Sequence, residues 1–124
     1  MNKMNKKDIA TIFLKLASSG KVREAYDKYV HPDFRHHNAY FKGDRESLLR
    51  GMEEAAITSP NKFLEVQHVF EDGNMVAVHS HVKQENGTDI AVVHIFRFDG
   101  DQIVELWDVG QQVPKDSPNE NGVF

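Results

Sequence analysis

The chain has no cysteine among its 124 residues. Disulfide bonds, thiolate metal sites and cysteine nucleophiles are therefore excluded, and the absence is consistent with a cytoplasmic protein. Long apolar runs are missing too, so we expect neither a membrane span nor a signal peptide. There is no basic run beyond Lys3 to Lys7, and the net charge is −4. We therefore expect no binding to nucleic acid or to a membrane surface.

The first half of the chain has apolar residues at helical spacing, and its length suits one domain with one core. The pattern predicts helices over residues 6–18, about 21–30 and about 44–58, with Asp44 as the N-cap of the third. A short extended piece is expected around 34–38, between the second and third helices.

The second half predicts four strands rich in Val, Ile, Phe and His, each bounded by turn residues: roughly 62–70, 75–83, 89–98 and 103–112. Helices followed by an antiparallel meander indicate an α+β fold. Residues 114–124 are rich in Asn, Pro, Asp and Glu and predict an irregular C-terminal tail. The apolar end of this tail, Val123-Phe124, is able to dock on the body.

Turn dipeptides predict how the strands pair. A two-residue turn at Asn86-Gly87 sets His81 opposite Val92 and His79 opposite His94. Residues that lie directly opposite share a face of the sheet. This register therefore predicts that the three histidines lie on one face.

The two outer turns complete the predicted sheet. A two-residue turn at Asp72-Gly73 sets Phe70 opposite Met75. For the last hairpin, the preferred register pairs His94 with Asp108 and needs a longer loop with a bulge at Gly100. A competing tight turn turns Asp108 away, because a slip of one residue flips a whole strand.

In this arrangement one face is apolar and carries a polar cluster of His79, His81, His94 and Asp108, as in many small-molecule pockets. The opposite face is too apolar to be fully solvated. We expect it to form a homodimer interface, and its apolar members are Val76, Val78, Val82, Val93, Ile95, Ile103, Trp107 and Val109.

Several motifs resemble the SnoaL-like polyketide cyclases, a branch of the NTF2-like cone fold. They are Asp33-Phe34 before His37-Asn38, Gly43, Val78-His79-Ser80-His81-Val82, Ile95-Phe96-Arg97-Phe98 with Gly100, and Ile103-Val104-Glu105-Leu106-Trp107-Asp108-Val109. The end of the chain, 119–124, is similar to the tail of a bacterial subgroup of SnoaL-like aldol-condensation enzymes. The resemblance implies one domain over 1–113, with N-terminal helices packed on a curved antiparallel sheet.

The resemblance also implies a chemistry. The aspartate that matches Asp108 is the acid/base of an intramolecular aldol closure in such cyclases, and a histidine that matches His94 sits beside it. The family uses neither a metal nor an organic cofactor. The implied substrate is a small apolar carbonyl compound. We predict that it is bound by His79, His81, His37, Asn38, Phe96, Leu106 and Val92.

Two other functions fit the sequence. His79, His81 and His94 are a possible nitrogen ligand set for a transition metal, and Gly73, His79, His81 and Glu85 come near a cupin motif. Alternatively, the domain binds a small ligand without catalysis, as many cone folds do. Removing the charge of Asp108 separates an acid/base enzyme from a binding protein.

Overall fold

The structure is a computed structural model that describes residues 4–124. Three helices and five strands follow along the chain: α1 (Lys6–Ser18), α2 (Val22–Tyr29), β1 (Val30–His36), α3 (Arg45–Thr58), β2 (Asn61–Asp72), β3 (Met75–Gln84), β4 (Asp89–Asp99) and β5 (Gln102–Gln112). The predicted helices and the four-strand meander are confirmed. The expected extended piece is the longer strand β1, which begins directly after α2.

Polar side chains fix where the helices begin. Asn5 caps α1 and forms a capping box with Asp8, in which each side chain binds the other's backbone N–H. Asp44 caps α3 as predicted, because its carboxylate accepts a hydrogen bond from the backbone of Ser47. Both caps satisfy backbone donors that a helix leaves free in its first turn.

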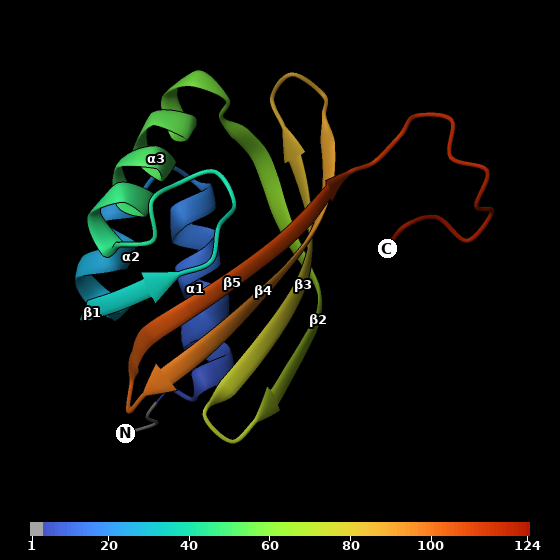
Figure 1. Ribbon diagram of the computed structural model, residues 1–124. Coiled ribbons are helices and arrows are strands. Elements are labelled where there is room, and N and C mark those ends of the chain that lie inside the picture. The colour runs from blue at the N-terminus through green and yellow to red at the C-terminus, as the bar shows by residue number, and fades with distance from the viewer. Residues whose placement is uncertain (1–3) are drawn as a thin grey trace.

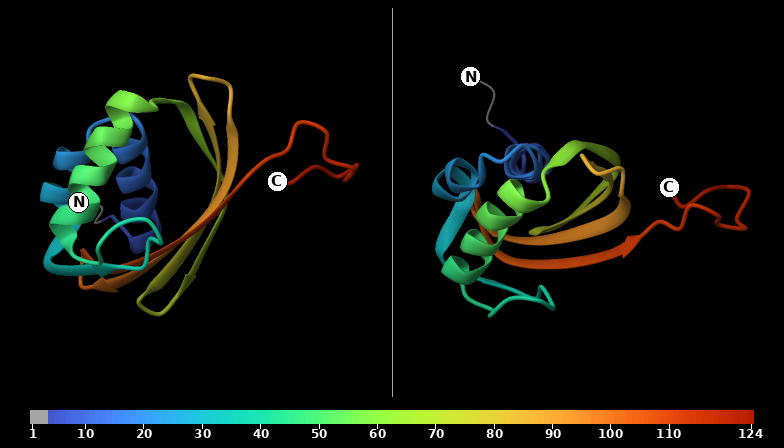
Figure 2. Two further views of the ribbon diagram at one scale, coloured as in Figure 1. Left: turned by 45° about the horizontal axis from the view of Figure 1, so that its top comes forward. Right: turned by 90° about the horizontal axis from the view of Figure 1, so that it is seen from above.

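The strands form one curved sheet in the order β1-β5-β4-β3-β2, with β1 parallel to β5 and all other pairs antiparallel. The helices cover only the concave side of this sheet, and its edges do not close into a barrel (Figure 1 and Figure 2). The core lies between the two layers, where the buried rings of Phe13, Tyr26 and Phe96 pack edge to face or tilted. This α+β architecture agrees with the expected cone.

The predicted register of the β3–β4 hairpin is wrong by one residue. His79 pairs with Val93, and His94 pairs with Val78. The connection is a three-residue loop, Glu85 to Gly87, and the backbone N–H of Gln84 on one side donates to the carbonyl oxygen of Thr88 on the other. Gly87 has a φ of 92°, as expected for a three-residue hairpin that ends in a left-handed residue. The extra loop residue puts His79 and His81 on the convex face, opposite to His94.

The β2–β3 hairpin also differs from the prediction. Its tight turn is Gly73-Asn74, so Phe70 pairs with Ala77 and not with Met75. A bulge between Val66 and His68 reverses the alternation along β2. His68 therefore stands beside His79 on the convex face, although the even-numbered residues before the bulge, Leu64 and Val66, face the helices.

The preferred register of the β4–β5 hairpin is confirmed, because His94 pairs with Asp108 and Arg97 pairs with Glu105. The loop is tight, however, since Asp99 pairs with Gln102. The extra residue is instead Val104, which forms a bulge within β5. The bulge therefore lies at Val104 and not at the predicted Gly100. Both polar pairs, Arg97 with Glu105 and His94 with Asp108, are the same in either case.

These registers revise the composition of the convex face. Its apolar members include Val93, Ile95, Trp107 and Val109, as predicted. Val76, Val78, Val82 and Ile103 instead belong to the buried core, with Ser80 among them. The convex face instead gains the odd-numbered residues of β3: Met75, Ala77, His79 and His81.

The last residues, beyond β5, contain neither helix nor strand and loop away from the sheet before the chain turns back (Figure 1). The predicted docking of the tail is observed at its end, where the ring of Phe124 stacks on His81 with a centroid distance of 4.0 Å. Within residues 4–124 none of the helices has the length and apolarity needed to cross a membrane.

Candidate active site inside the cone

A cross-strand pair, His94 on β4 and Asp108 on β5, faces the helices. Both side chains project from the concave surface of the sheet, among the residues that form the core. This is the one part of the predicted polar cluster that the sheet brings together. It depends on the bulge at Val104, which restores the register after the tight turn.

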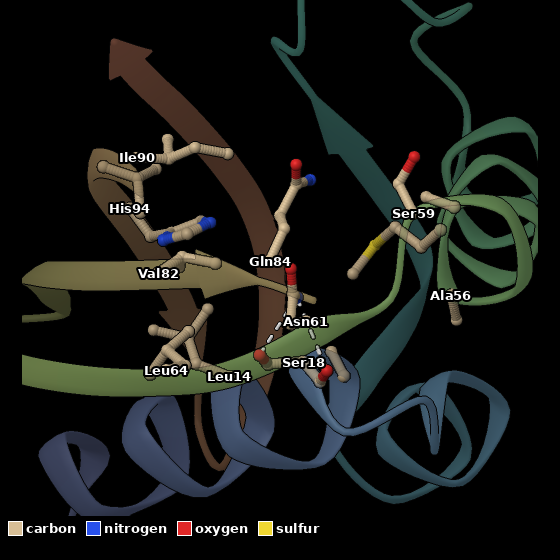
Figure 3. A pocket seen from close by; sticks show the side chains of 14 residues that line it. Leu14, Ser18, Ala56, Ser59, Asn61, Leu64, Val82, Gln84, Ile90 and His94 are labelled. Carbon is tan, nitrogen blue, oxygen red and sulfur yellow. Dashed lines mark hydrogen bonds between the residues drawn. The ribbon is translucent and has the colours of Figure 1, made fainter. Parts of the chain in front are cut away.

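His94 lies at the wall of a cavity of about 270 Å³ between the sheet, α1 and α3 (Figure 3). The other lining residues are Leu14, Ala17, Ser18, Met52, Ala55, Ala56, Ser59, Asn61, Leu64, Val82, Gln84, Ile90 and Val92. Most of this wall is apolar, and Asn61 is held by hydrogen bonds to Ser18. An apolar wall with a few placed polar groups is typical of a site for a small organic ligand.

The surroundings of His94 keep its imidazole neutral. Burial lowers its pKa to about 4, although the negative charge of Asp108 acts in the opposite direction. Its Nδ1 atom is buried and has no hydrogen-bond partner. The part of the ring that lines the cavity is therefore the opposite edge, which carries Nε2.

Asp108 is held from the other side by the loop after β1. Asn38 donates from its side-chain amide to Oδ2 of Asp108 at 2.9 Å. The backbone N–H of Asn38 donates to Nδ1 of His36, whose Nε2 lies 2.7 Å from the carbonyl oxygen of Lys42. His36 therefore carries its proton on Nε2, because a carbonyl accepts only. His36 is buried at 5% exposure and orders this loop.

Asp108 opens into a second hollow, of about 640 Å³, near the end of the cone. Asn38 and Tyr40 also line it. The two hollows share Gln84, Ile90 and Val92 in their walls. His94 and Asp108 therefore line adjoining spaces. Val92 lines both of them, and Asn38 lines the one at Asp108.

Two predicted ligand-binding residues, Phe96 and Leu106, lie in the core beneath the site. They are 0% and 3% exposed and line neither hollow. The cavity uses polar residues that sequence reasoning missed, above all Asn61 and Gln84. Asn61 is the first residue of β2 and Gln84 is the last residue of β3, and the two pair across the sheet. Only the correct β2–β3 register would have placed them together.

His79 and His81 belong to a row of rings on the convex face, so the prediction that they share a pocket with His94 is wrong. Nδ1 of His79 lies 3.0 Å from Nδ1 of His68. His81 binds Asp89 at 2.7 Å and packs between Phe63 and Phe124. The hydrogen bond from His81, together with Lys83, lowers the pKa of Asp89.

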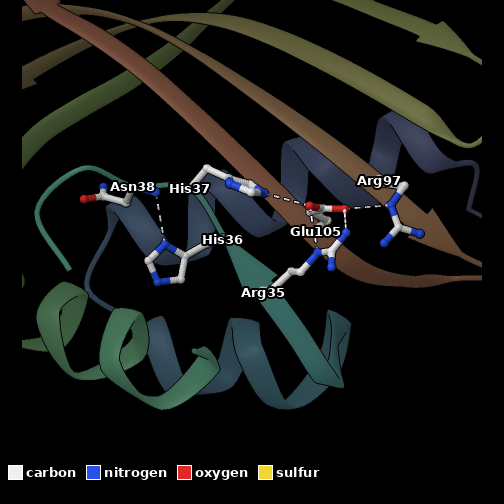
Figure 4. Close-up of polar contacts among 6 residues, drawn as sticks. All are labelled: Arg35, His36, His37, Asn38, Arg97 and Glu105. Carbon is white, nitrogen blue, oxygen red and sulfur yellow. Dashed lines mark hydrogen bonds and ion pairs between the residues drawn. The ribbon is translucent and has the colours of Figure 1, made fainter. Parts of the chain in front are cut away.

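His37 is also absent from the cavity. It lies 2.7 Å from the carboxylate of Glu105 (Figure 4). Its ring stacks on that of Trp107 with a centroid distance of 4.9 Å. Arg35 and Arg97 bind the same carboxylate, with shortest distances of 2.8 and 3.0 Å. The hydrogen bond from Arg35, with those from His37 and Arg97, outweighs burial and lowers the pKa of Glu105 to about 2. This cluster fastens β1 to the sheet.

The predicted metal site does not form. The β3–β4 register puts His79 and His81 on one face of the sheet and His94 on the other. Across residues 4–124, no group of three or more His, Cys, Asp or Glu side chains is arranged to hold a metal ion. The cupin-like spacing around His79 is therefore a coincidence of strand and turn composition.

The sequence model of the family described as SnoaL-like domain matches residues 12–106. That range includes all three helices in whole or part, His94 and Glu105, and it ends two residues before Asp108. The comparison with curated proteins gives no match to this chain.

Solved structures share the fold at low sequence identity. IdmH from Streptomyces antibioticus, proposed to be a polyketide cyclase, is 18% identical with a TM-score of 0.74, over 87% of this chain and 93% of IdmH. SMa1630 from Sinorhizobium meliloti, with the same proposed role, is 18% identical with a TM-score of 0.69, over 82% and 94%. An NTF2-like protein of unknown function from Cytophaga hutchinsonii is also 18% identical, with a TM-score of 0.72 over 89% and 93%. These likenesses show the fold.

Proposed function

The chain belongs to the family of SnoaL-like domains, and we propose that it is a cyclase or isomerase that carries out metal-free acid/base chemistry on a small carbonyl compound. Asp108 is the base and then the acid, and His94 is its partner. The observation that carries this proposal is the inward-facing His94–Asp108 pair at the junction of two hollows. We place this activity in the cytoplasm, because the chain has no cysteine.

The walls of the site suit such a substrate. The cavity beside His94 is lined mainly by aliphatic side chains, so it favours an apolar molecule. A volume of about 270 Å³ limits the part of the molecule that enters it to a small fragment. The adjoining, larger hollow at Asp108 leaves room for the rest.

The reaction requires one carboxylate that first accepts a proton from the substrate and later returns it. Asp108 removes a proton from a carbon next to a carbonyl group, and the electron pair moves onto the carbonyl oxygen as an enolate. In an aldol closure the enolate carbon then bonds to a second carbonyl carbon of the same molecule. The new alkoxide takes the proton back from Asp108. The neutral imidazole of His94 hydrogen-bonds the enolate oxygen.

Proton abstraction is testable without the natural substrate. A panel of small 1,3-dicarbonyl compounds and methyl ketones, incubated with the protein in D₂O, is followed by proton NMR for exchange of the acidic C–H. We expect catalysed exchange for some members, and a loss of about 10²–10⁴-fold in Asp108→Asn. Asp27→Asn is the matched control, because Asp27 is exposed on α2. Exchange that survives in Asp108→Asn would overturn the assignment.

The same variant separates catalysis from simple ligand binding. The Asn side chain keeps the size of Asp108 and its ability to accept from Asn38. A binding protein would therefore retain affinity for a panel compound in Asp108→Asn and show no exchange in either form. Titration calorimetry with the tightest-binding compound gives this second readout.

We also propose that a second copy of the chain covers the convex face, through Val93, Ile95, Trp107 and Val109. No helix within residues 4–124 lies on this side of the sheet (Figure 2), and Val109 is 66% exposed. A lysine in place of Val109 would put a charge in the interface and weaken the dimer. Sedimentation should then shift toward the monomer, while Ile57→Lys, at an exposed site on α3, leaves it unchanged. A monomeric wild-type protein at micromolar concentration would contradict the proposal.

A further inference from the structure

Two polar atoms on the concave face of the sheet are buried without a hydrogen-bond partner: Oγ of Ser80 and Nδ1 of His94. Among the described residues only one other buried side-chain atom shares this condition, Nε of Arg45, and a second nitrogen of that guanidinium bonds to the carbonyl of Tyr26. Buried polar groups are nearly always satisfied, so two such atoms close together call for a physical explanation.

Ser80 and His94 are neighbours on adjacent strands. Ser80 on β3 pairs with Val92, and His94 on β4 pairs with Val78, so the two are diagonal across one step of the ladder. Both point toward the helices, and Ser80 is 0% exposed. Diagonal neighbours on one face are within reach of a side chain as long as histidine.

The donors and acceptors of the two groups are complementary. A serine hydroxyl can donate one proton, and the neutral imidazole has one nitrogen that can accept. Donation from Ser80 to Nδ1 of His94 satisfies both atoms at once. The reverse bond, from an Nδ1–H to the serine oxygen, would leave the hydroxyl proton of Ser80 without an acceptor.

We propose that Ser80 is a positioning residue that holds His94 with its proton on Nε2, through a hydrogen bond from Oγ to Nδ1 that is direct or passes through one buried water. His94 then presents an N–H donor to the cavity. The ligand class follows from this donor: a molecule with an oxygen acceptor, such as a carbonyl or enolate oxygen, at the wall formed by His94. The ligand class rests on the proposed function, whereas the role of Ser80 does not.

A competing arrangement involves Asp108. If Nδ1 of His94 carried the proton and donated it to the Asp108 carboxylate, Nε2 would be an acceptor and the cavity would favour a ligand with a donor. Asp108 already accepts from Asn38, whereas Oγ of Ser80 is buried and has no other hydrogen-bond partner. The two arrangements differ in which nitrogen is protonated, which is directly measurable.

Nitrogen-15 NMR of the ring nitrogens at pH 7 gives the test, since the imidazole of His94 is neutral there. Long-range proton–nitrogen correlations distinguish a nitrogen that carries hydrogen from one that does not, and a His94→Gln spectrum assigns the signals. We expect the Nε2–H form in the wild type. Ser80→Val should raise the fraction of the Nδ1–H form, because the Asp108 carboxylate beside the ring is then the acceptor that favours it, and Ser80→Thr should retain Nε2–H. Valine and threonine have the same shape and differ in the hydroxyl.

Two results would overturn the proposal: an Nδ1–H form in the wild type, or the same form in Ser80→Val as in the wild type. Ser80→Ala, which adds no bulk in the core, gives the same readout if Ser80→Val fails to fold. Because no ligand is present, the result is independent of whether Asp108 proves to be a base.

Proton exchange from a methyl ketone, measured in Ser80→Thr and Ser80→Ala, then tests the oxygen acceptor: we expect Ser80→Thr to retain the exchange rate and Ser80→Ala to lose about tenfold or more. Equal rates would contradict it.

Discussion

Strands β4 and β5 carry two cross-strand polar pairs that face opposite sides of the sheet. Arg97 and Glu105 face outward, and His94 and Asp108 face the helices. The outward carboxylate has three partners, and its pKa falls to about 2. The inward imidazole has a buried nitrogen without a partner, and its pKa falls to about 4.

Both pKa values fall, but for opposite reasons. Bound cations and hydrogen bonds favour the charged form of Glu105, whereas burial disfavours the charged form of His94. A polar group whose hydrogen-bond partners are all supplied by the protein has a structural role. A group that is buried beside a cavity and left with bonding capacity is available to a ligand. The comparison therefore separates structural from functional polarity on one pair of strands.

The largest expected effect on stability comes from replacing the carboxylate of Glu105 by a neutral amide, and the same replacement at Asp108 is the comparison. Glu105→Gln should lower the free energy of unfolding by about 3 kcal/mol at pH 7, because the pKa of Glu105 lies well below its ordinary 4.5 in the folded chain. Its contribution is present above pH 4.5 and is lost as the pH falls toward 2. Urea unfolding at pH 7 and pH 3 measures both values. Asp108→Asn should change stability by less than about 1 kcal/mol.

A similar loss of stability in both variants would remove the distinction between the two pairs. Arg50→Gln is the control for general charge effects, because Arg50 forms only an exposed pair with Glu46 on α3.

The next effect concerns acid. The pKa of His94 is about 4 in the fold and 6.5 ordinarily, so the unfolded chain takes up a proton first as the pH falls below 6.5. The wild type should therefore lose about 2 kcal/mol of stability between pH 7 and pH 4.5 that His94→Gln does not lose. Unfolding curves of the two proteins at both pH values, taken as a difference, cancel the other histidines. Parallel pH profiles would show that His94 is not held neutral.

A smaller effect is expected from the loop that holds Asp108. Asn38→Ala removes the amide that donates to Oδ2, and we expect about a tenfold loss in proton exchange, since hydrogen bonds to charged groups contribute about 1.5–3 kcal/mol. Asn119→Ala, in the tail, is the matched control. An unchanged exchange rate would show that Asp108 is oriented by other contacts.

The smallest effect lies on the convex face. Phe124→Ala removes the ring that stacks on His81, and because Phe124 is 40% exposed we expect a loss of only about 0.5–1 kcal/mol. Thermal unfolding gives the change in stability. Proton exchange should remain at the wild-type rate, because the ring lies on the far side of the sheet from His94. A drop in exchange would link the two faces.

The elements of the fold could be predicted from local signals. Caps such as Asp44, helical spacing and turn residues are encoded within a few neighbours, and the helices and meander were found from them. The pairing of His94 with Asp108 was also found, because the flanking pair Arg97–Glu105 is favourable in only one register.

The rest of the site could not be predicted, because one residue more or less in a turn or bulge decides which face of the sheet a side chain is on. Asn86-Gly87 favours a two-residue turn, but the loop takes in Glu85 as well, and His79 and His81 moved to the other face. Nothing in the local sequence fixes the choice between these two loops. The burial of Val78 and Ser80 against the helices fixes it, and that is a property of the packed domain.

The bulge at Val104 has a consequence for how relatives of this chain are compared. A relative that loses one residue between this bulge and Asp108, and is otherwise identical, would turn Asp108 to the convex face, whereas a relative that loses Val104 itself would keep Asp108 opposite His94. A relative that keeps the number of residues between the bulge and the aspartate can differ at most other positions and still preserve the cavity. In this family the position of a one-residue gap is therefore a better guide to shared chemistry than the percentage of matching residues.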